Sequence, residues 1–146
     1  MAPVSKSFFS GYDTVQLARK LIGMRLVHET DDGIVGGRIV ETEAYLRDDP
    51  ACHASRGKTK RNSSMFLEAG RAYVYLIYGM YCCFNVVSCE EGVGEAVLIR
   101  ALEPETGIPL MKMRRGTEDE VNLASGPGKI CEALGIDRSV DGHALW

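Results

Sequence analysis

The chain has 146 residues, of which 45% are apolar and 25% are charged, and its formal net charge at pH 7 is −3. These values are typical of one folded domain. They exclude a disordered chain, a collagen-like chain and a globally basic nucleic-acid binder. The longest mostly apolar run, 73–87, is too short for a membrane-spanning helix. We therefore expect no membrane association, and any anionic partner must be bound by local basic patches.

The cysteines and the first residues bear on the cellular location. The five cysteines are an odd number, form no Cys-x-x-Cys pair, and include the adjacent Cys82 and Cys83. This pattern favours reduced thiols over a disulfide framework or a zinc site. Residues 1–10 lack the apolar stretch and cleavage site of a secretory signal. The sequence predicts a cytoplasmic protein without a metal.

A short amphipathic helix is predicted near the N-terminus. It begins after Asp13, which can cap it together with Gln16 three residues later, and it ends at Gly23. Its buried face is formed by residues 14, 17, 18, 21 and 22, which recur with helical spacing.

The rest of the chain predicts one sheet and further helices. A turn at 31–33 joins two strands into a hairpin, and Gly36-Gly37 indicates a bulge in the second strand. The polar segment 46–62 is long for a connection, and long ordered loops often carry function. The remaining predicted elements are strands over 24–29, 34–45, 73–78, 81–88 and 96–102, a short helix over 63–68, a turn over 90–95, and helices over 105–115 and 127–134. Together they predict an α+β fold, a single domain with a mostly antiparallel curved sheet flanked by helices.

The second strand carries acidic candidates for chemistry. Because side chains alternate between faces, Glu41, Glu43 and Tyr45 should share one face of this strand. With His53 on the loop that follows, they form either one wall of a pocket or a solvated strand face. Cys52 and His53 are adjacent and point apart, so we do not expect a catalytic dyad.

The two aromatic strands present a second candidate surface. Alternation places Tyr73, Tyr75 and Ile77 on one face, and it places Tyr81, Cys83, Asn85 and Val87 on another. These sets form either sheet core with tyrosine hydroxyls at its margin or the lining of a site. The corner 78–81 joins the strands and carries two tyrosines and a methionine where a turn is normally polar. These side chains either wedge into a partner or pack under a neighbouring loop.

Basic residues are clustered in three places. Arg56, Lys58, Lys60 and Arg61 lie within six positions of the long loop, and Lys112, Arg114 and Arg115 form a second cluster. The segment 125–129, with Lys129 at a helix start, offers free backbone N–H groups but lacks the spacing of a Walker A loop. Each cluster either holds phosphates or is a solvated surface. Our candidates for phosphate contacts are Arg56, Lys58, Lys60, Arg61 and Lys129.

These segments together resemble the alkyladenine (3-methyladenine) DNA glycosylase family. The resemblance covers residues 8–146. The probability that so many motifs would match in the same order by chance is very small. The matching segments are LARKLIG (17–23), GRIVETEAYL (37–46), His53, RN (61–62), MF (65–66), YVY (73–75), YGMY (78–81), Asn85, VLIRALEP (97–104) and SGPGK (125–129).

The resemblance implies roles for individual residues. A damaged purine would be flipped out of the duplex and its bond to the sugar hydrolysed. By the family pattern, Glu43 activates the attacking water and Arg100 helps to hold that water. The base-pocket residues by the same pattern are Tyr45, His53, Tyr75 and Asn85, with Asn85 disfavouring guanine. Tyr78, with Met80 beside it, matches the wedge that fills the gap left in the base stack.

The resemblance also implies the partners and the extent of the protein. We expect a monofunctional, cofactor-free glycosylase that acts as a monomer on double-stranded DNA containing damaged purines, and that is associated with the nucleoid if the source is prokaryotic. The alternative is a catalytically inactive domain that binds DNA lesions. The family pattern continues with a C-terminal segment that completes the sheet and part of the pocket. The resemblance therefore implies that 1–146 is a single purine-DNA-glycosylase domain without that segment.

Overall fold

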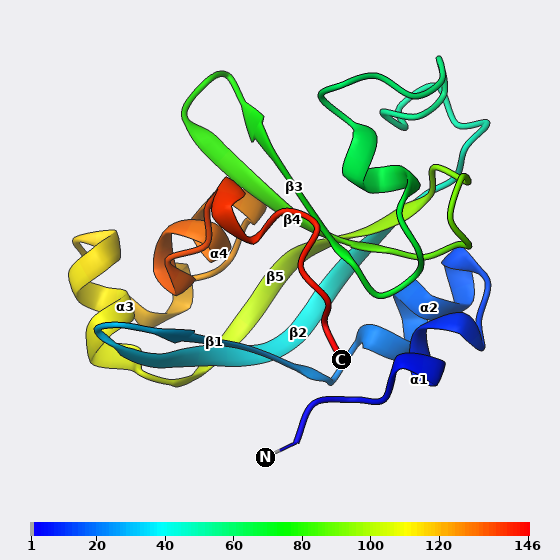
Figure 1. Ribbon diagram of the computed structural model, residues 1–146. Helices are drawn as coiled ribbons and strands as arrows, with labels where there is room; N and C mark the ends of the chain where they lie inside the picture. Colours follow the sequence, from blue (N-terminus) through cyan, green and yellow to red (C-terminus); the bar gives the residue numbers. More distant parts are fainter. Residues whose placement is uncertain (1) are drawn as a thin grey trace.

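The computed structural model describes residues 2–146 and places one curled sheet at the centre of the molecule (Figure 1). The elements in chain order are α1 (Lys6–Ser10), α2 (Thr14–Leu21), β1 (Arg25–Thr30), β2 (Gly33–Tyr45), the 3₁₀ helix η1 (Ser63–Phe66), β3 (Ala72–Ile77), β4 (Tyr81–Val87), β5 (Ala96–Thr106), α3 (Ile108–Arg115), η2 (Glu120–Asn122), α4 (Pro127–Leu134) and η3 (Arg138–Val140). The predicted α+β class is confirmed.

The sheet is antiparallel throughout, with strand order β1-β2-β5-β4-β3. The predicted bulge is confirmed, because the register between β2 and β5 shifts between Gly36 and Gly37. A Cβ atom at Gly37 would lie 2.4 Å from the Glu103 carbonyl oxygen, so the close approach of the strands there requires glycine. Further shifts between Ile39 and Thr42 bend β2 just before the candidate acidic residues.

The helix after Asp13 has the predicted boundaries and cap. The Asp13 carboxylate accepts from the Gln16 N–H, and the Gln16 side chain accepts from the Asp13 N–H, which completes a capping box. The chain leaves the helix at Ile22, and Gly23 adopts φ +89°, a conformation that favours glycine. Thr14, Leu17, Ala18 and Leu21 are buried, so these four residues of the predicted face are confirmed. The prediction is wrong for Ile22, which lies just past the helix in extended backbone and is 44% exposed.

The helix predicted over 105–115 is wrong at its start. Glu105 and Thr106 extend β5, because Thr106 pairs with Gly36 of β2. The chain then turns at Gly107, which has φ +71° and lies so close to Ile34 that a Cβ atom would be 2.3 Å from its carbonyl oxygen. Helix α3 therefore begins only at Ile108, after the last ladder pair.

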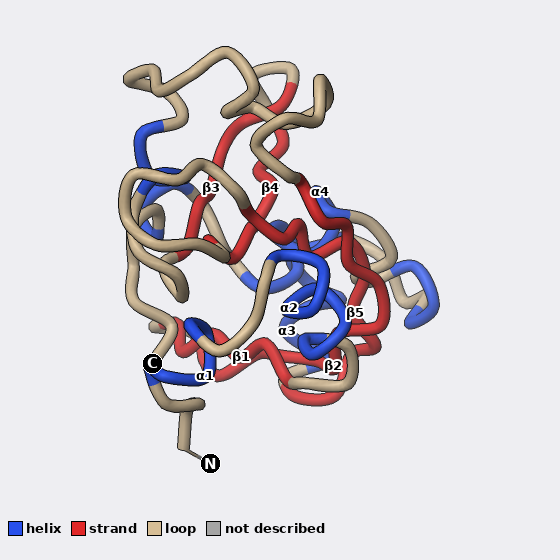
Figure 2. The backbone as a smooth tube through the Cα atoms, turned by 90° about the vertical axis from the view of Figure 1, so that its right-hand side faces the viewer, coloured by secondary structure: helices blue, strands red, loops and turns tan. Residues whose placement is uncertain are grey.

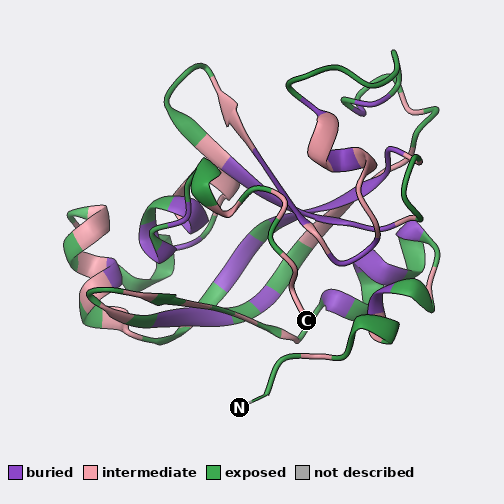
Figure 3. Cartoon of the chain, in the orientation of Figure 1, coloured by how far each residue is buried: buried purple, intermediate pink, exposed green. Residues whose placement is uncertain are grey.

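One face of the sheet carries the main core. Helix α2 packs against β2 and β5, while α4 packs against β4 and β5, and both helices contribute to the same buried cluster. Figure 3 shows the buried residues concentrated in the central strands and the exposed ones at the hairpin tip and the upper loop. The sheet residues of this cluster include Val74, Phe84, Val86, Val97, Ile99 and Leu102.

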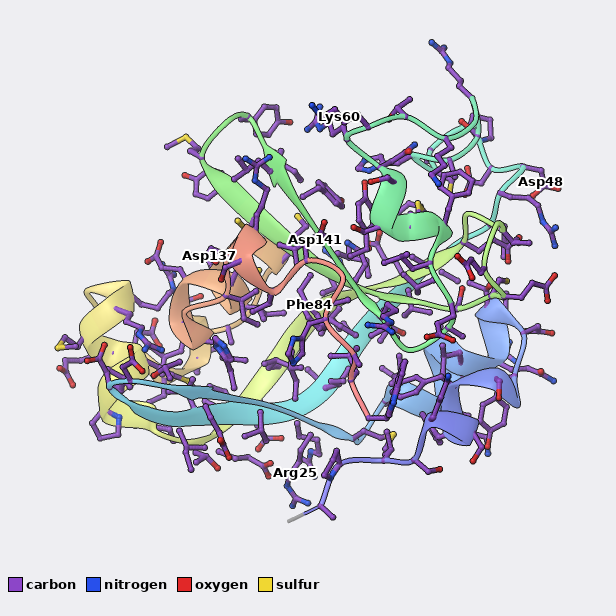
Figure 4. The ribbon with its side chains drawn as sticks, in the orientation of Figure 1. Arg25, Asp48, Lys60, Phe84, Asp137 and Asp141 are labelled. Carbon is purple, nitrogen blue, oxygen red and sulfur yellow. The ribbon has the colours of Figure 1, made fainter. Side chains whose placement is uncertain are left out.

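The opposite face carries a second, smaller cluster beneath the loop 46–62 and η1. It contains Tyr73, Val87 and Ala96 from the sheet, with Cys52 and Met65 from the segment that covers them. The C-terminal residues run beside the edge strand β3, where Val74 donates its N–H to the Asp141 carboxylate at 2.8 Å (Figure 4). Within residues 2–146, no helix is long and apolar enough to cross a membrane.

Candidate active site

Glu43 and Arg100 form an ion pair on the sheet face that carries the smaller cluster. Glu43 lies opposite Leu98 in the ladder, and Arg100 is two residues further along β5 on the same face. Arg100 Nε lies 3.1 Å from Glu43 Oε1, and both side chains are nearly half exposed, at 46% and 40%. The carboxylate is thus held in place but remains open to water and substrate.

Tyr45 holds the second oxygen of the same carboxylate. Its hydroxyl donates to Glu43 Oε2 at 2.5 Å. This hydrogen bond, with a contribution from burial, raises the pKa of Tyr45 to about 12, so the phenol remains a donor at neutral pH. Glu43 and Tyr45 therefore share a face as predicted. The register of β2 is irregular on either side of Glu41, yet Glu41 and Glu43 line one open groove together with Arg100 and with Val15 and Arg19 of α2.

An aromatic cavity of about 70 Å³ opens beside the Glu43–Tyr45 pair. Tyr73 and Tyr75 form its sheet wall, with ring centroids 5.3 Å apart, and the His53 ring lies 4.3 Å from that of Tyr75. Tyr73 pairs with Asn85 in the ladder, so the two strands present these side chains on one common face. The cavity is lined by Tyr45, Ala51, His53, Met65, Tyr73, Tyr75 and Asn85.

His53 is oriented by Tyr73. The Nδ1 atom of His53 lies 2.9 Å from the Tyr73 hydroxyl, at hydrogen-bond distance. Burial of its inner edge, together with the charge of Arg61, lowers the pKa of His53 below its usual value. The imidazole is therefore neutral at neutral pH. Cys52 is buried and donates its thiol hydrogen toward the Gly94 carbonyl, whereas His53 bonds to Tyr73, as expected for adjacent residues that do not form a dyad.

Asn85 is buried at the floor of the cavity, with 3% of its surface exposed. Its amide nitrogen donates to the Tyr73 carbonyl oxygen at 3.1 Å across the β3–β4 ladder. The side chain is therefore fixed by the strand that carries the stacking tyrosines.

Tyr78 and Met80 of the β3–β4 corner stand free in solvent and do not pack under a neighbouring loop, whereas Tyr81 at its base is about half exposed. Tyr78 is 90% exposed and Met80 is 68% exposed, at the tip that projects upward in Figure 1. Tyr78 also has φ +54°, the only positive φ of a non-glycine among the described residues. A bulky side chain in this region is strained, and such strain is often found at functional sites.

The basic part of the long loop lies next to this corner. Arg61 donates to the Leu76 carbonyl oxygen at 2.6 Å, which ties the loop to the β3–β4 hairpin. Figure 4 shows Lys60 on the part of the loop that faces the hairpin tip, and Figure 2 shows the loops and the tip gathered at one end of the molecule. Arg56, Lys58 and Lys60 are exposed, and none of them forms an ion pair within the described chain.

The second basic cluster is occupied by structural contacts. Lys112 pairs with Glu118 and Glu120, and Arg115 pairs with Glu132. Arg114 donates to the Ala133 carbonyl oxygen at the end of α4. Of the two interpretations of this cluster, the structure therefore favours a helix surface over a phosphate site.

Lys129 lies in the first turn of α4, where its ammonium reaches the Ser125 hydroxyl at 3.3 Å. This turn packs against the hairpin, since a Cβ atom at Gly128 would lie 3.3 Å from the Tyr81 ring. The start of α4 and the base of the exposed corner are thus neighbours.

Three contributors to this site were not assigned from the sequence. Strand alternation predicts that Tyr73 lies on the same face as Tyr75, but the hydrogen bond between Tyr73 and His53 depends on how the long loop folds. Asn62 is buried and donates to the carbonyl oxygens of His53 and Gly57, so it braces the loop from within. Glu95, in the turn before β5, is also buried, and only burial distinguishes it from a surface carboxylate.

The described residues offer no obvious metal site. Within residues 2–146, no three His, Cys, Asp or Glu side chains are grouped closely enough to hold a metal ion, and the five cysteines are free thiols. The chemistry that this arrangement offers is that of one oriented carboxylate beside an aromatic slot.

Comparison with known proteins identifies relatives over almost the whole chain. The family model described as methylpurine-DNA glycosylase (MPG) matches residues 7–146. The "Putative 3-methyladenine DNA glycosylase" of Methanoculleus marisnigri is 58% identical over 133 residues, which are 91% of this chain and 69% of that protein. Proteins of the same name from Carboxydothermus hydrogenoformans and Francisella tularensis are 52% and 50% identical, over 94% and 90% of this chain and 72% and 68% of their own lengths. This chain belongs to the methylpurine-DNA glycosylase family.

Proposed function

We propose that this DNA glycosylase hydrolyses the N-glycosidic bond of alkylated purines, 3-methyladenine and related bases, after the damaged nucleotide rotates out of the duplex. The observation that carries the proposal is the position of Glu43. Its carboxylate is held by Arg100 in an open groove and by Tyr45, which itself lines the aromatic cavity. The relatives' names point to the same class of substrate.

Glu43 is the general base of the proposed reaction. It deprotonates a water molecule that attacks the anomeric carbon of the sugar while the bond to the purine breaks. The same carboxylate stabilises the oxocarbenium-like charge that develops on the sugar. Arg100 and Tyr45 each bind one oxygen of Glu43, so they orient it for this step without a further change in conformation.

The aromatic cavity selects the base. An N3- or N7-alkylated purine is a cation and leaves readily, and electron-rich rings attract it by stacking and by cation–π interaction. Tyr45, Tyr75 and His53 all line this slot, and the His53 and Tyr75 rings are in contact. A neutral His53 suits a cationic base, because it adds no positive charge beside it.

The exposed corner and the basic residues bind duplex DNA. Tyr78 and Met80 insert into the space that the flipped base leaves, which offsets part of the free energy lost on unstacking. The phosphate contacts come from Arg56, Lys58, Lys60, Arg61 and Lys129. None of the described residues that line the cavity is a lysine, so the proposed reaction uses water as the nucleophile and does not cleave the strand.

The experiment that tests this function is release of free 3-methyladenine from alkylated duplex DNA under single-turnover conditions. The wild-type chain should release the base, and Glu43→Gln should lose release while it still binds the lesion duplex, because the amide keeps the shape but not the basicity. Glu41→Gln is the matched control and should behave as wild type. Lesion binding without release by the wild type would make the chain an inactive lesion binder, and release by Glu43→Gln would move the general base elsewhere.

A further inference from the structure

A buried carboxylate that the proposed chemistry does not use lies at the base of the long loop. Glu95 precedes β5 and has 6% of its surface exposed. Its Oε1 atom accepts from the Thr14 hydroxyl at 2.6 Å and from the Cys89 thiol at 3.3 Å. Its Oε2 atom accepts from Arg47 twice, from the backbone N–H at 3.2 Å and from Nε at 2.9 Å. Both oxygens are thus fully engaged.

These contacts keep Glu95 charged. Burial acts to raise the pKa of Glu95, but the hydrogen bonds from Thr14, Arg47 and Cys89 outweigh it and hold the pKa below its usual value. Thr14 is also bonded to the Ser88 hydroxyl at 2.8 Å. One carboxylate therefore joins the first residue of α2, the end of β4 and the start of the long loop.

Glu95 and its neighbour Gly94 contact the long loop 46–62 at two places, one at its start and one around His53. Arg47 is two residues beyond Tyr45, the residue that binds Glu43. The Gly94 carbonyl accepts from the Cys52 thiol, and a Cβ atom at Gly94 would lie 2.4 Å from that of Ala54. The loop is therefore held at Arg47 and again on both sides of His53.

We infer that Glu95 is a positioning residue for base recognition, which anchors the loop at Arg47 so that His53 stays packed against Tyr75. The inference rests on the proposed function. Asn62 already holds the second half of the loop through the His53 and Gly57 carbonyl groups. Glu95 supplies the corresponding restraint at the other end. Its loss should loosen the cavity wall while Glu43 and Arg100, which are held by the sheet, keep their geometry.

The first test is amide hydrogen exchange over residues 48–58 in the DNA-free protein. Glu95→Gln keeps the shape of the side chain but replaces the charged acceptor, so exchange in this segment should be faster by about tenfold. Glu105→Gln is the matched control, since Glu105 lies at the far end of β5 from Glu95 and pairs there with Arg25. The control should exchange as wild type.

The second test separates positioning from general stability. In single-turnover excision of 3-methyladenine, Glu95→Gln should raise the protein concentration at half-maximal rate by about tenfold, with the maximal rate within about threefold of wild type. Arg47→Ala removes the same ion pair from its other partner. Because the Arg47 side chain is exposed, this change should not unfold the core. The two changes combined should have little more effect than Glu95→Gln alone.

The outcomes distinguish this inference from the proposed function. Absence of base release by the wild type and by Glu105→Gln would contradict the proposed function. Active wild type with unchanged exchange in Glu95→Gln and Arg47→Ala would overturn the anchor. Faster exchange without any rise in half-maximal concentration would overturn the role in recognition. A loss confined to the maximal rate would overturn it as well, because it would place Glu95 in the chemistry.

Discussion

The Tyr45 hydroxyl and the Glu43 carboxylate share a 2.5 Å hydrogen bond two residues apart on one face of β2. The same tyrosine lines the aromatic cavity, so one side chain is both a wall of the proposed base slot and a ligand of the proposed general base. In the proposed reaction, a base bound against this ring would contact the residue that orients Glu43, so one hydrogen bond would link base recognition to the chemistry.

Tyr45→Phe separates these two roles. The ring remains for stacking, but Oε2 of Glu43 loses its donor, and a hydrogen bond to a charged group is worth about 1.5–3 kcal/mol. We expect the single-turnover rate of 3-methyladenine release to fall about tenfold, with affinity for lesion duplex changed less than threefold. Tyr45→Ala should lose both rate and affinity. An unchanged rate in Tyr45→Phe would show that Arg100 alone orients Glu43.

Tyr78→Ala tests the wedge. The side chain is 90% exposed, and alanine keeps the Cβ atom at the φ of +54°, so the free energy of unfolding should be nearly unchanged. Affinity for a lesion in duplex DNA should fall about tenfold, because unstacking costs a few kcal/mol that the wedge offsets. Excision from single-stranded DNA should change little. Equal losses on both substrates would argue against a role in filling the base stack.

The sequence predicts the sheet residues of the site better than the loop residues. Alternation along β2, β3 and β4 is a local property, so it correctly places Glu43 with Tyr45, and Tyr73 with Tyr75. It does not show that the two aromatic sets, predicted on separate faces, lie on one face, because that depends on the pairing of Tyr73 with Asn85. The contacts of Asn62 and Glu95 depend on how the long loop folds back, and no period in the sequence encodes them.

Lys58→Gln with Lys60→Gln tests the phosphate contacts. Both residues are exposed on the loop that Arg61 ties to the β3–β4 hairpin, so the double change should weaken binding to any duplex and reduce the log–log salt slope by about 0.9 per lost contact. Arg25→Gln is a suitable control, because Arg25 lies at the opposite end of the molecule from Lys60 in Figure 4. Fluorescence anisotropy over a salt series measures the slope. A slope equal to that of wild type would show that Lys58 and Lys60 do not contact phosphates and that this part of the loop is a solvated surface.

Acid stability should depend on Glu95. Its pKa in the folded protein is held below the ordinary value of 4.5, so its contribution to stability is present above that value and is lost as the pH falls through the lowered pKa. Glu95→Gln should therefore be less stable than wild type at neutral pH, and the difference should shrink below about pH 4. Thermal unfolding followed by circular dichroism at several pH values measures this. A constant difference at all pH values would show that the charge of Glu95 does not contribute.

Asn85→Ser is the most direct test of the cavity's shape. Asn85 is 3% exposed and tied to the Tyr73 carbonyl oxygen, so its side chain cannot swing away from a base in the slot. The cavity is small, about 70 Å³, and a base with an additional exocyclic amino group at the Asn85 edge would clash there and leave its hydrogen bonds unpaired. Serine removes that obstruction, at a loss of about 1 kcal/mol from the hydrogen bond to Tyr73.

The expected result is a change in the ratio of products rather than in overall activity. Asn85→Ser should raise excision of 7-methylguanine, and of some undamaged guanine, by about tenfold relative to 3-methyladenine, since only the guanine bases carry the amino group that Asn85 obstructs. The measurement is single-turnover release of each base from matched duplexes by both proteins. If serine does not move the ratio, Asn85 braces the β3–β4 ladder and does not read the base.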